Sequence, residues 1–148
     1  MRNYTGHGYQ GSNYNRNLGI KEIAKLIRTQ LKKDFPECKF SVQIERYSMG
    51  QSLHIYLMES PFKVSTDPDF KGYRQLNWYF PDESESELKR ILEQTKITPQ
   101  LYYIMGEVHS LVNSYNYDDS DGMIDYFDTN FYMHLNVGKW DKPYKQIN

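Results

Sequence analysis

The sequence predicts an α+β fold, in which a small antiparallel sheet is packed on one face by two to three helices. Two observations support this. Residues 18–35 repeat apolar side chains at three- and four-residue steps, as an amphipathic helix does. Residues 39–59 and 131–137 alternate apolar and polar side chains, as half-buried strands do. The sheet is expected to combine a β-hairpin with a C-terminal strand, in the order α-β-β-α-α-β.

The first helix is expected between Leu18 and Phe35. Its apolar residues form one stripe, and Pro36 ends the helix because it lacks a backbone N–H and restricts the preceding residue. A second stripe at the same period is basic, so one exposed face of the helix carries positive charge. The four cations of this stripe are Lys21, Lys25, Arg28 and Lys32.

A hairpin is expected directly after this helix. Apolar and polar residues alternate on both sides of a short turn at Met49-Gly50-Gln51. The residues expected to face the core are Phe40, Val42, Ile44, Leu53, Ile55 and Leu57.

Two more helices are expected before the last strand. Acidic residues crowd the start of residues 82–95, and Ser84 and Glu87 have the spacing of a capping box, which predicts a short helix there. Thr98 followed by Pro99 predicts the start of a longer amphipathic helix, because proline is favoured at the first helical position.

A chain of 148 residues is expected to form one domain. Residues 1–17, rich in Gly, Asn and Tyr, are predicted to be a flexible arm. Residues 18–138 form the single α+β domain, and residues 139–148 form a C-terminal tail. A single cysteine, Cys38, leaves no internal disulfide, and no apolar run reaches the length of a membrane span. We therefore expect a cytoplasmic protein that does not bind membranes.

The net charge of −1 is unevenly distributed. Residues 1–46 hold nine Lys or Arg against four Asp or Glu, whereas residues 97–138 hold six acidic residues and no Lys or Arg. Such asymmetry is typical of proteins that bind charged partners.

Two surfaces are therefore candidates for binding. The first is acidic and rich in tyrosine, a residue that buries area while keeping a polar tip. Its expected members are Asp118, Asp119, Asp121, Asp125, Asp128, Tyr115, Tyr117, Tyr126 and Tyr132. The second is the basic stripe, whose cations would contact phosphates while exposed Tyr47, Tyr56 or Tyr132 stack on bases.

Catalytic and metal sites are weakly supported. An EF-hand alignment of the loop around Asp121-Gly122 places Tyr117 and Asp128 where the first carboxylate and a bidentate Glu are needed. His54 and His134 are expected close together on the outer face of the sheet, but two histidines without a third ligand make a poor metal site. No catalytic triad, phosphate-binding loop or dinucleotide motif is present. We therefore expect no enzyme, no metal and no cofactor.

Two blocks of the sequence resemble a known family. The first block reads IAKLIR at 23–28, LK at 31–32, FP at 35–36, KFSV at 39–42 and YSMGQS at 47–52, and the second reads DGMIDY at 121–126. They are similar to the large polyvalent protein associated domain that is the twenty-ninth of its series. The resemblance covers roughly residues 18–62 and 110–138, so that residues 63–98 look like an insertion, and Met49 stands where a second glycine is usual.

This resemblance implies residence on phages, plasmids or other mobile elements of bacteria, and it brings no catalytic residues. The expected function is that of a non-enzymatic accessory protein. The first hypothesis is a counter-defence inhibitor, anti-CRISPR or anti-restriction, which binds a host CRISPR effector or restriction enzyme through the acidic, Tyr-rich surface. The alternative is a nucleic-acid-binding accessory factor of DNA transfer or replication that uses the basic stripe.

Overall fold

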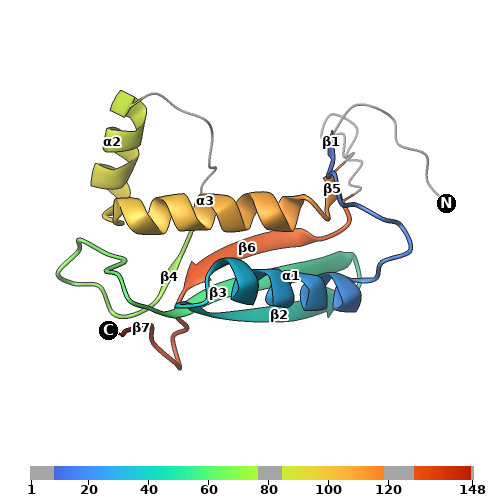
Figure 1. Cartoon of the computed structure of the whole chain (residues 1–148), viewed down its shortest axis with the longest axis horizontal. Coiled ribbons are helices and arrows are strands. Elements are labelled where there is room, and N and C mark those ends of the chain that lie inside the picture. The colour runs from blue at the N-terminus through green and yellow to red at the C-terminus, as the bar shows by residue number, and fades with distance from the viewer. Residues whose placement is uncertain (1–8, 77–84, 119–128, 148) are drawn as a thin grey trace.

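The computed structural model of the chain describes residues 9–76, 85–118 and 129–147, and Figure 1 shows how its elements are arranged. The helices are α1 (Ile20–Asp34), α2 (Glu85–Thr95) and α3 (Pro99–Asn113). The strands are β1 (Tyr9–Gln10), β2 (Lys39–Tyr47), β3 (Gly50–Ser60), β4 (Arg74–Gln75), β5 (Tyr117–Asp118), β6 (Tyr132–Val137) and β7 (Lys145–Gln146). The α+β class, with a small sheet and covering helices, is confirmed.

The main sheet has the strand order β2-β3-β6-β4, and β7 also pairs with β3. β2 and β3 form the predicted antiparallel hairpin, with Tyr47 opposite Gly50. β6 runs parallel to β3, so the sheet is mixed and the prediction of a wholly antiparallel sheet is wrong. The reason is the crossover through α2 and α3, which brings the chain back to the same end of the sheet before β6 begins. Four strands of two residues each, β1, β4, β5 and β7, are added to the expected order.

The hydrophobic core lies between one face of the sheet and the helices. α1 and α3 cover this face, and α2 stands at the end of α3 (Figure 1). The core residues come from the predicted stripes of the helices and the predicted core-facing positions of the strands. The largest of them with almost no exposure are Ile23, Ile27, Leu31, Leu53, Ile55, Leu57, Leu101, Met105, Val108, Val112, Phe131 and Val137.

The predicted helix boundaries are explained by local contacts. α1 ends at Asp34, and the N–H of Phe35 still donates to the carbonyl of Leu31 (2.9 Å) before Pro36 stops the helix. Thr98 caps α3 as predicted, because its side chain accepts a hydrogen bond from the N–H of Leu101 (3.3 Å).

The segment before α1 is hydrogen-bonded to the end of α3. The N–H of Gly11 donates to the carbonyl of Asn116 (2.8 Å), and the N–H of Asn13 donates to that of Ser114 (2.7 Å). A Cβ on Gly11 would come within 2.3 Å of the carbonyl oxygens of Asn113 and Ser114, so glycine allows this close approach. β1 then pairs with β5, which lies beside it in Figure 1.

We predict that Asn116→Ala destabilises the fold, because Asn116 joins the end of α3 to the start of β6. Its side chain is buried, Nδ2 donates to the carbonyl of Phe131 (2.9 Å), and Oδ1 accepts from the N–H groups of Tyr117 (2.9 Å) and Phe131 (3.2 Å). Leaving such buried groups without partners should lower the free energy of unfolding by about 1–3 kcal/mol.

Urea denaturation measures this loss, and Asn13→Ala is the matched control. The amide of Asn13 is exposed and donates to the hydroxyl of Ser114 (3.0 Å), so its removal should change stability by less than about 0.5 kcal/mol. Equal losses for the two variants would contradict the role given to Asn116.

Candidate functional site

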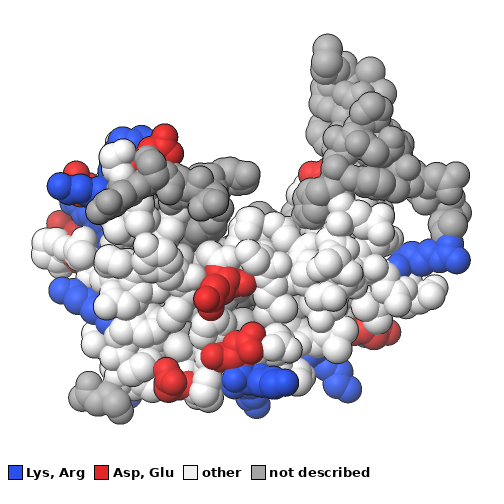
Figure 2. Space-filling model, turned by 45° about the horizontal axis from the view of Figure 1, so that its top comes forward, with Lys and Arg blue, Asp and Glu red and all other residues white. Residues whose placement is uncertain are grey.

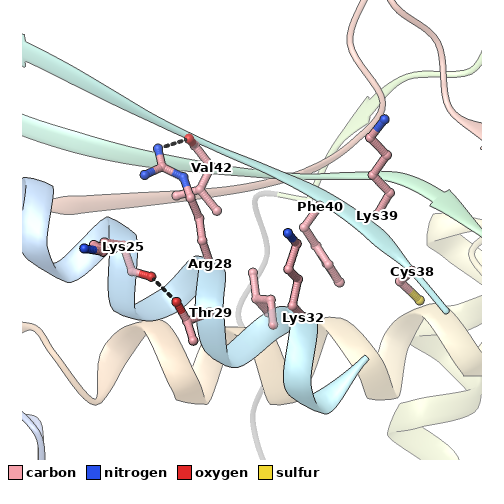
Figure 3. Close-up of a pocket in the computed structure, with 9 residues that line it drawn as sticks. Lys25, Arg28, Thr29, Lys32, Cys38, Lys39, Phe40 and Val42 are labelled. Atoms are coloured by element: carbon pink, nitrogen blue, oxygen red, sulfur yellow. Dashed lines mark hydrogen bonds between the residues drawn. The ribbon is translucent and has the colours of Figure 1, made fainter. Parts of the chain in front are cut away.

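A groove of about 420 Å³ lies between α1 and β2 (Figure 3). Figure 3 shows Arg28 and Lys32 pointing from α1 toward β2, with Cys38 at one end of the groove. Four of the lining residues are cations, and the remainder are mainly apolar. The lining residues are Lys25, Arg28, Thr29, Leu31, Lys32, Cys38, Lys39, Phe40 and Val42, and we call this site the basic groove.

Helical spacing and the sheet edge together build the basic groove. Lys25, Arg28 and Lys32 recur at three and four residues, so they share one side of α1. β2 is an edge strand of the main sheet and has no strand on its outer side among the described residues. Nη2 of Arg28 donates to the carbonyl of Val42 in β2 (2.7 Å), which fixes the guanidinium at the wall of the groove.

The structure brings together three of the four cations that the sequence selected. Lys25, Arg28 and Lys32 line the basic groove, whereas Lys21 lies in the first turn of α1 outside its lining. Lys39 completes the lining and was missed by the sequence reasoning, which considered only the helical stripe. The sequence feature that could have pointed to Lys39 is its position at the start of the strand after Pro36, where the chain turns back along α1. Nζ of Lys39 lies 3.8 Å from a carboxylate oxygen of Glu59.

The outer face of the sheet carries the two histidines that the sequence expected to meet. His54 and His134 are opposite one another in the β3–β6 register, and their rings stack with centroids 4.6 Å apart and planes 13° apart. Nε2 of His54 donates to Oε1 of Glu45 on β2 (3.0 Å), which holds this ring in place. The expectation that the two rings approach one another is confirmed.

Three tyrosines lie on the same outer face. An added Cβ on Gly50 would lie 3.4 Å from a ring carbon of Tyr47 and 3.4 Å from one of Tyr132, so both rings border this glycine. Tyr56 lies next to His54, with ring centroids 6.4 Å apart, and Nζ of Lys139 sits 4.8 Å from the centre of the Tyr56 ring. We call the rings of Tyr47, His54, Tyr56, Tyr132 and His134 the aromatic face.

The acidic, Tyr-rich surface falls only partly on described residues. Asp119, Asp121, Asp125, Tyr126 and Asp128 lie outside them. Of the others, Asp118 belongs to β5, Tyr115 packs against the core, and the ring of Tyr117 meets that of Tyr14 edge to face, with centroids 5.0 Å apart. Tyr132 is 41% exposed and belongs to the aromatic face. Figure 2 looks onto α3 and shows a wide area without Lys or Arg, in keeping with the sequence of residues 97–138.

The described residues give little support for a reactive thiol or a metal site. Burial, followed by the charge of Glu37, raises the pKa of the Cys38 thiol, which therefore stays protonated near neutral pH. Among the described residues, no three His, Cys, Asp or Glu side chains gather as metal ligands. None of the described helices combines the length and apolar character needed to cross a membrane.

We predict that His134 makes stability depend on pH. Burial, followed by the charge of His54, lowers the pKa of His134 below its ordinary value of 6.5, and Glu45 opposes this only partly. The unfolded chain therefore takes up this proton first as pH falls. The stabilising contribution is complete above pH 6.5 and is lost as pH falls through the lowered pKa.

Urea denaturation at several pH values between about 5 and 8 tests this effect, with His134→Asn as the variant. The difference in stability between wild type and variant should shift in favour of the wild type as pH rises. Effects of pH on groups remote from His134 are common to both proteins and cancel in this difference. Parallel pH profiles for the two proteins would contradict the prediction.

One comparison with known proteins gives a match. The model of the family called large polyvalent protein associated domain 29 matches residues 18–109. The matched range contains the residues of the basic groove and ends before β6. No curated protein and no solved structure matches the chain. Because the match covers more than half of the chain, the protein belongs to the large polyvalent protein associated domain 29 family, whose domains are associated with phages and other mobile elements.

Proposed function

We propose that this protein is a non-enzymatic accessory factor of a mobile element that binds nucleic acid through the basic groove. The observation that supports this most directly is the convergence of Lys25, Arg28, Lys32 and Lys39 on one groove. Lysine and arginine side chains supply most of the affinity of proteins for nucleic acids, because each phosphate they neutralise releases bound counterions.

The surroundings of the groove also favour an anionic ligand. Lys25, Lys32 and Lys39 are all exposed, so their ammonium groups are accessible to phosphates. Arg28 is anchored to Val42, which leaves its position fixed before a ligand arrives. A carboxylate oxygen of Glu59 lies 3.8 Å from Nζ of Lys39. Lys39 is exposed and Glu59 is half-buried, so this ion pair is weak and a phosphate can compete with Glu59 for the lysine.

A second function, counter-defence, is favoured by the charge of the other half of the chain. Residues 97–138 carry six acidic residues and no Lys or Arg. Asp118, the first aspartate of this acidic, Tyr-rich surface in the sequence, belongs to β5. An acidic surface of this kind would fit the cationic nucleic-acid groove of a host CRISPR effector or restriction enzyme. Association of the family with mobile elements supports such a role.

We predict that Lys25→Gln/Lys32→Gln weakens binding to DNA and reduces its salt dependence. Removing two cations that neutralise phosphates should lower the slope of log affinity against log salt by about 2. Fluorescence anisotropy with a labelled oligonucleotide, titrated at several salt concentrations, measures both effects. The double variant leaves Arg28 and its hydrogen bond to Val42 in place.

The matched control is Lys89→Gln/Arg90→Gln, which removes the same charge from exposed positions of α2. This control should bind nearly as the wild type does. If wild type does not bind DNA even at low salt, or if the two double variants lose affinity equally, the basic groove is not a nucleic-acid site.

The counter-defence hypothesis predicts that reversing Asp118, Asp119 and Asp121 to Lys abolishes protection of a phage against a host defence system. A plaque assay in cells that carry a CRISPR or restriction system measures this protection. The Lys25→Gln/Lys32→Gln variant should still protect if the acidic surface alone is responsible. Full protection by the triple variant would contradict this function for the acidic surface.

A further inference from the structure

We propose that the aromatic face binds the bases of a single-stranded nucleic acid whose phosphates lie in the basic groove. This inference rests on the proposed nucleic-acid function and specifies its ligand. Its basis is the position of the two surfaces on either side of one edge strand, β2.

The aromatic face has the composition of a surface on which bases stack. Its rings come from three adjacent strands, β2, β3 and β6, and neighbouring strands of a sheet are about 4.8 Å apart. Tyr47 and Tyr132 are 43% and 41% exposed, so their rings are open to a ligand. Aromatic side chains bind the unpaired bases of single strands in this way, with little dependence on sequence.

The rings are also held in place before a ligand arrives. The hydroxyl of Tyr47 is hydrogen-bonded to that of Ser52 (2.8 Å). His54 is fixed by Glu45 on one side and by the stacked ring of His134 on the other. Between Tyr47 and Tyr132, Gly50 has no side chain, and both rings lie against this position, where an added Cβ would be 3.4 Å from a ring carbon of each. Ordered rings lose little conformational entropy on binding.

The charges on this side of the sheet favour bases over phosphates. Glu45 lies on the aromatic face, and the charges of Glu45 and Asp141 both act on Tyr56, raising its pKa after the larger effect of burial. Tyr56 therefore remains a neutral phenol, and the carboxylates repel phosphates from the middle of the face. Lys139 is already engaged there, with Nζ over the Tyr56 ring and 3.1 Å from the hydroxyl of Ser41.

β2 connects the two surfaces. Successive side chains of a strand point to opposite faces. Phe40 and Val42 accordingly line the basic groove, while Glu45 and Tyr47 belong to the outer face. A nucleotide chain that follows β2 would meet cations on one side of the strand and rings on the other. Paired bases in a duplex are hidden inside the helix, so a duplex would use the groove alone.

The test compares wild type with Tyr132→Ala and Tyr47→Ala in anisotropy titrations. The ligands are a labelled oligothymidine of about 12 nucleotides, within the range that small single-strand-binding folds cover, and a duplex of the same length. Wild type should prefer the single strand. Each alanine variant should lose roughly 5- to 150-fold in affinity for it, the equivalent of one base stack.

Two control variants separate stacking from folding. Tyr132→Phe keeps the ring and should bind as wild type does. Tyr103→Ala removes a tyrosine that is 58% exposed on α3, away from the sheet, and should change nothing. The alanine variants of the aromatic face should keep the salt slope of wild type. Lys25→Gln/Lys32→Gln should lower this slope, by about 0.7 for each phosphate of the single strand that a lysine no longer neutralises.

Each result distinguishes this inference from the proposed function. The inference is supported if wild type and Tyr103→Ala prefer the single strand whereas Tyr47→Ala and Tyr132→Ala do not. Equal binding of single strand and duplex, with alanine variants that bind like wild type, overturns it and leaves the basic groove as a nucleic-acid site. Absence of binding to both ligands overturns the inference together with the proposed function.

Discussion

The register of β3 is the constraint on which the rest of the structure depends. β3 is paired on both sides, with Ile55 opposite Val42 in β2 and opposite Leu135 in β6. Because side chains alternate along a strand, this register places one apolar row against the helices and leaves His54 and Tyr56 on the other side. If the pairing of β3 shifted by one residue, the two rows of side chains would change faces. One register therefore determines the core, the β2 wall of the basic groove and the aromatic face.

Features with a local cause were predicted from the sequence. The stripe of α1, the alternation in the hairpin and the Thr98-Pro99 start of α3 are each fixed by residues a few positions apart. The direction of β6 was not, because alternation tells which side chains share a face but is the same for a parallel and an antiparallel strand. The two-residue strands β1, β4, β5 and β7 were not predicted, because two residues are too few to show an alternation of apolar and polar side chains.

The same distinction applies to the candidate site. Helical spacing was enough to select Lys25, Arg28 and Lys32, but Lys39 joins them only through the way β2 runs beside α1. The histidine pair lay between these cases. The alternation in the sequence placed both histidines on the outer face of their strands. Their contact, however, depends on the pairing of β3 with β6, which lie eighty residues apart at this point. The acidic loop was selected by composition, and most of its residues lie outside the described parts of the chain.

The contacts of Gly11 and Asn13 have a consequence for shortened versions of this protein. The last carbonyls of a helix have no partner within the helix, and here the segment before α1 supplies donors to the carbonyls of Ser114 and Asn116 just beyond α3. Residues 11–13 thus fix the chain that leaves α3, although they come from a distant part of the sequence. A recombinant version that starts at α1 would lose both hydrogen bonds but keep the carbonyls that accept them, whereas one trimmed to residues 18–109 would also end inside α3 and lack β6.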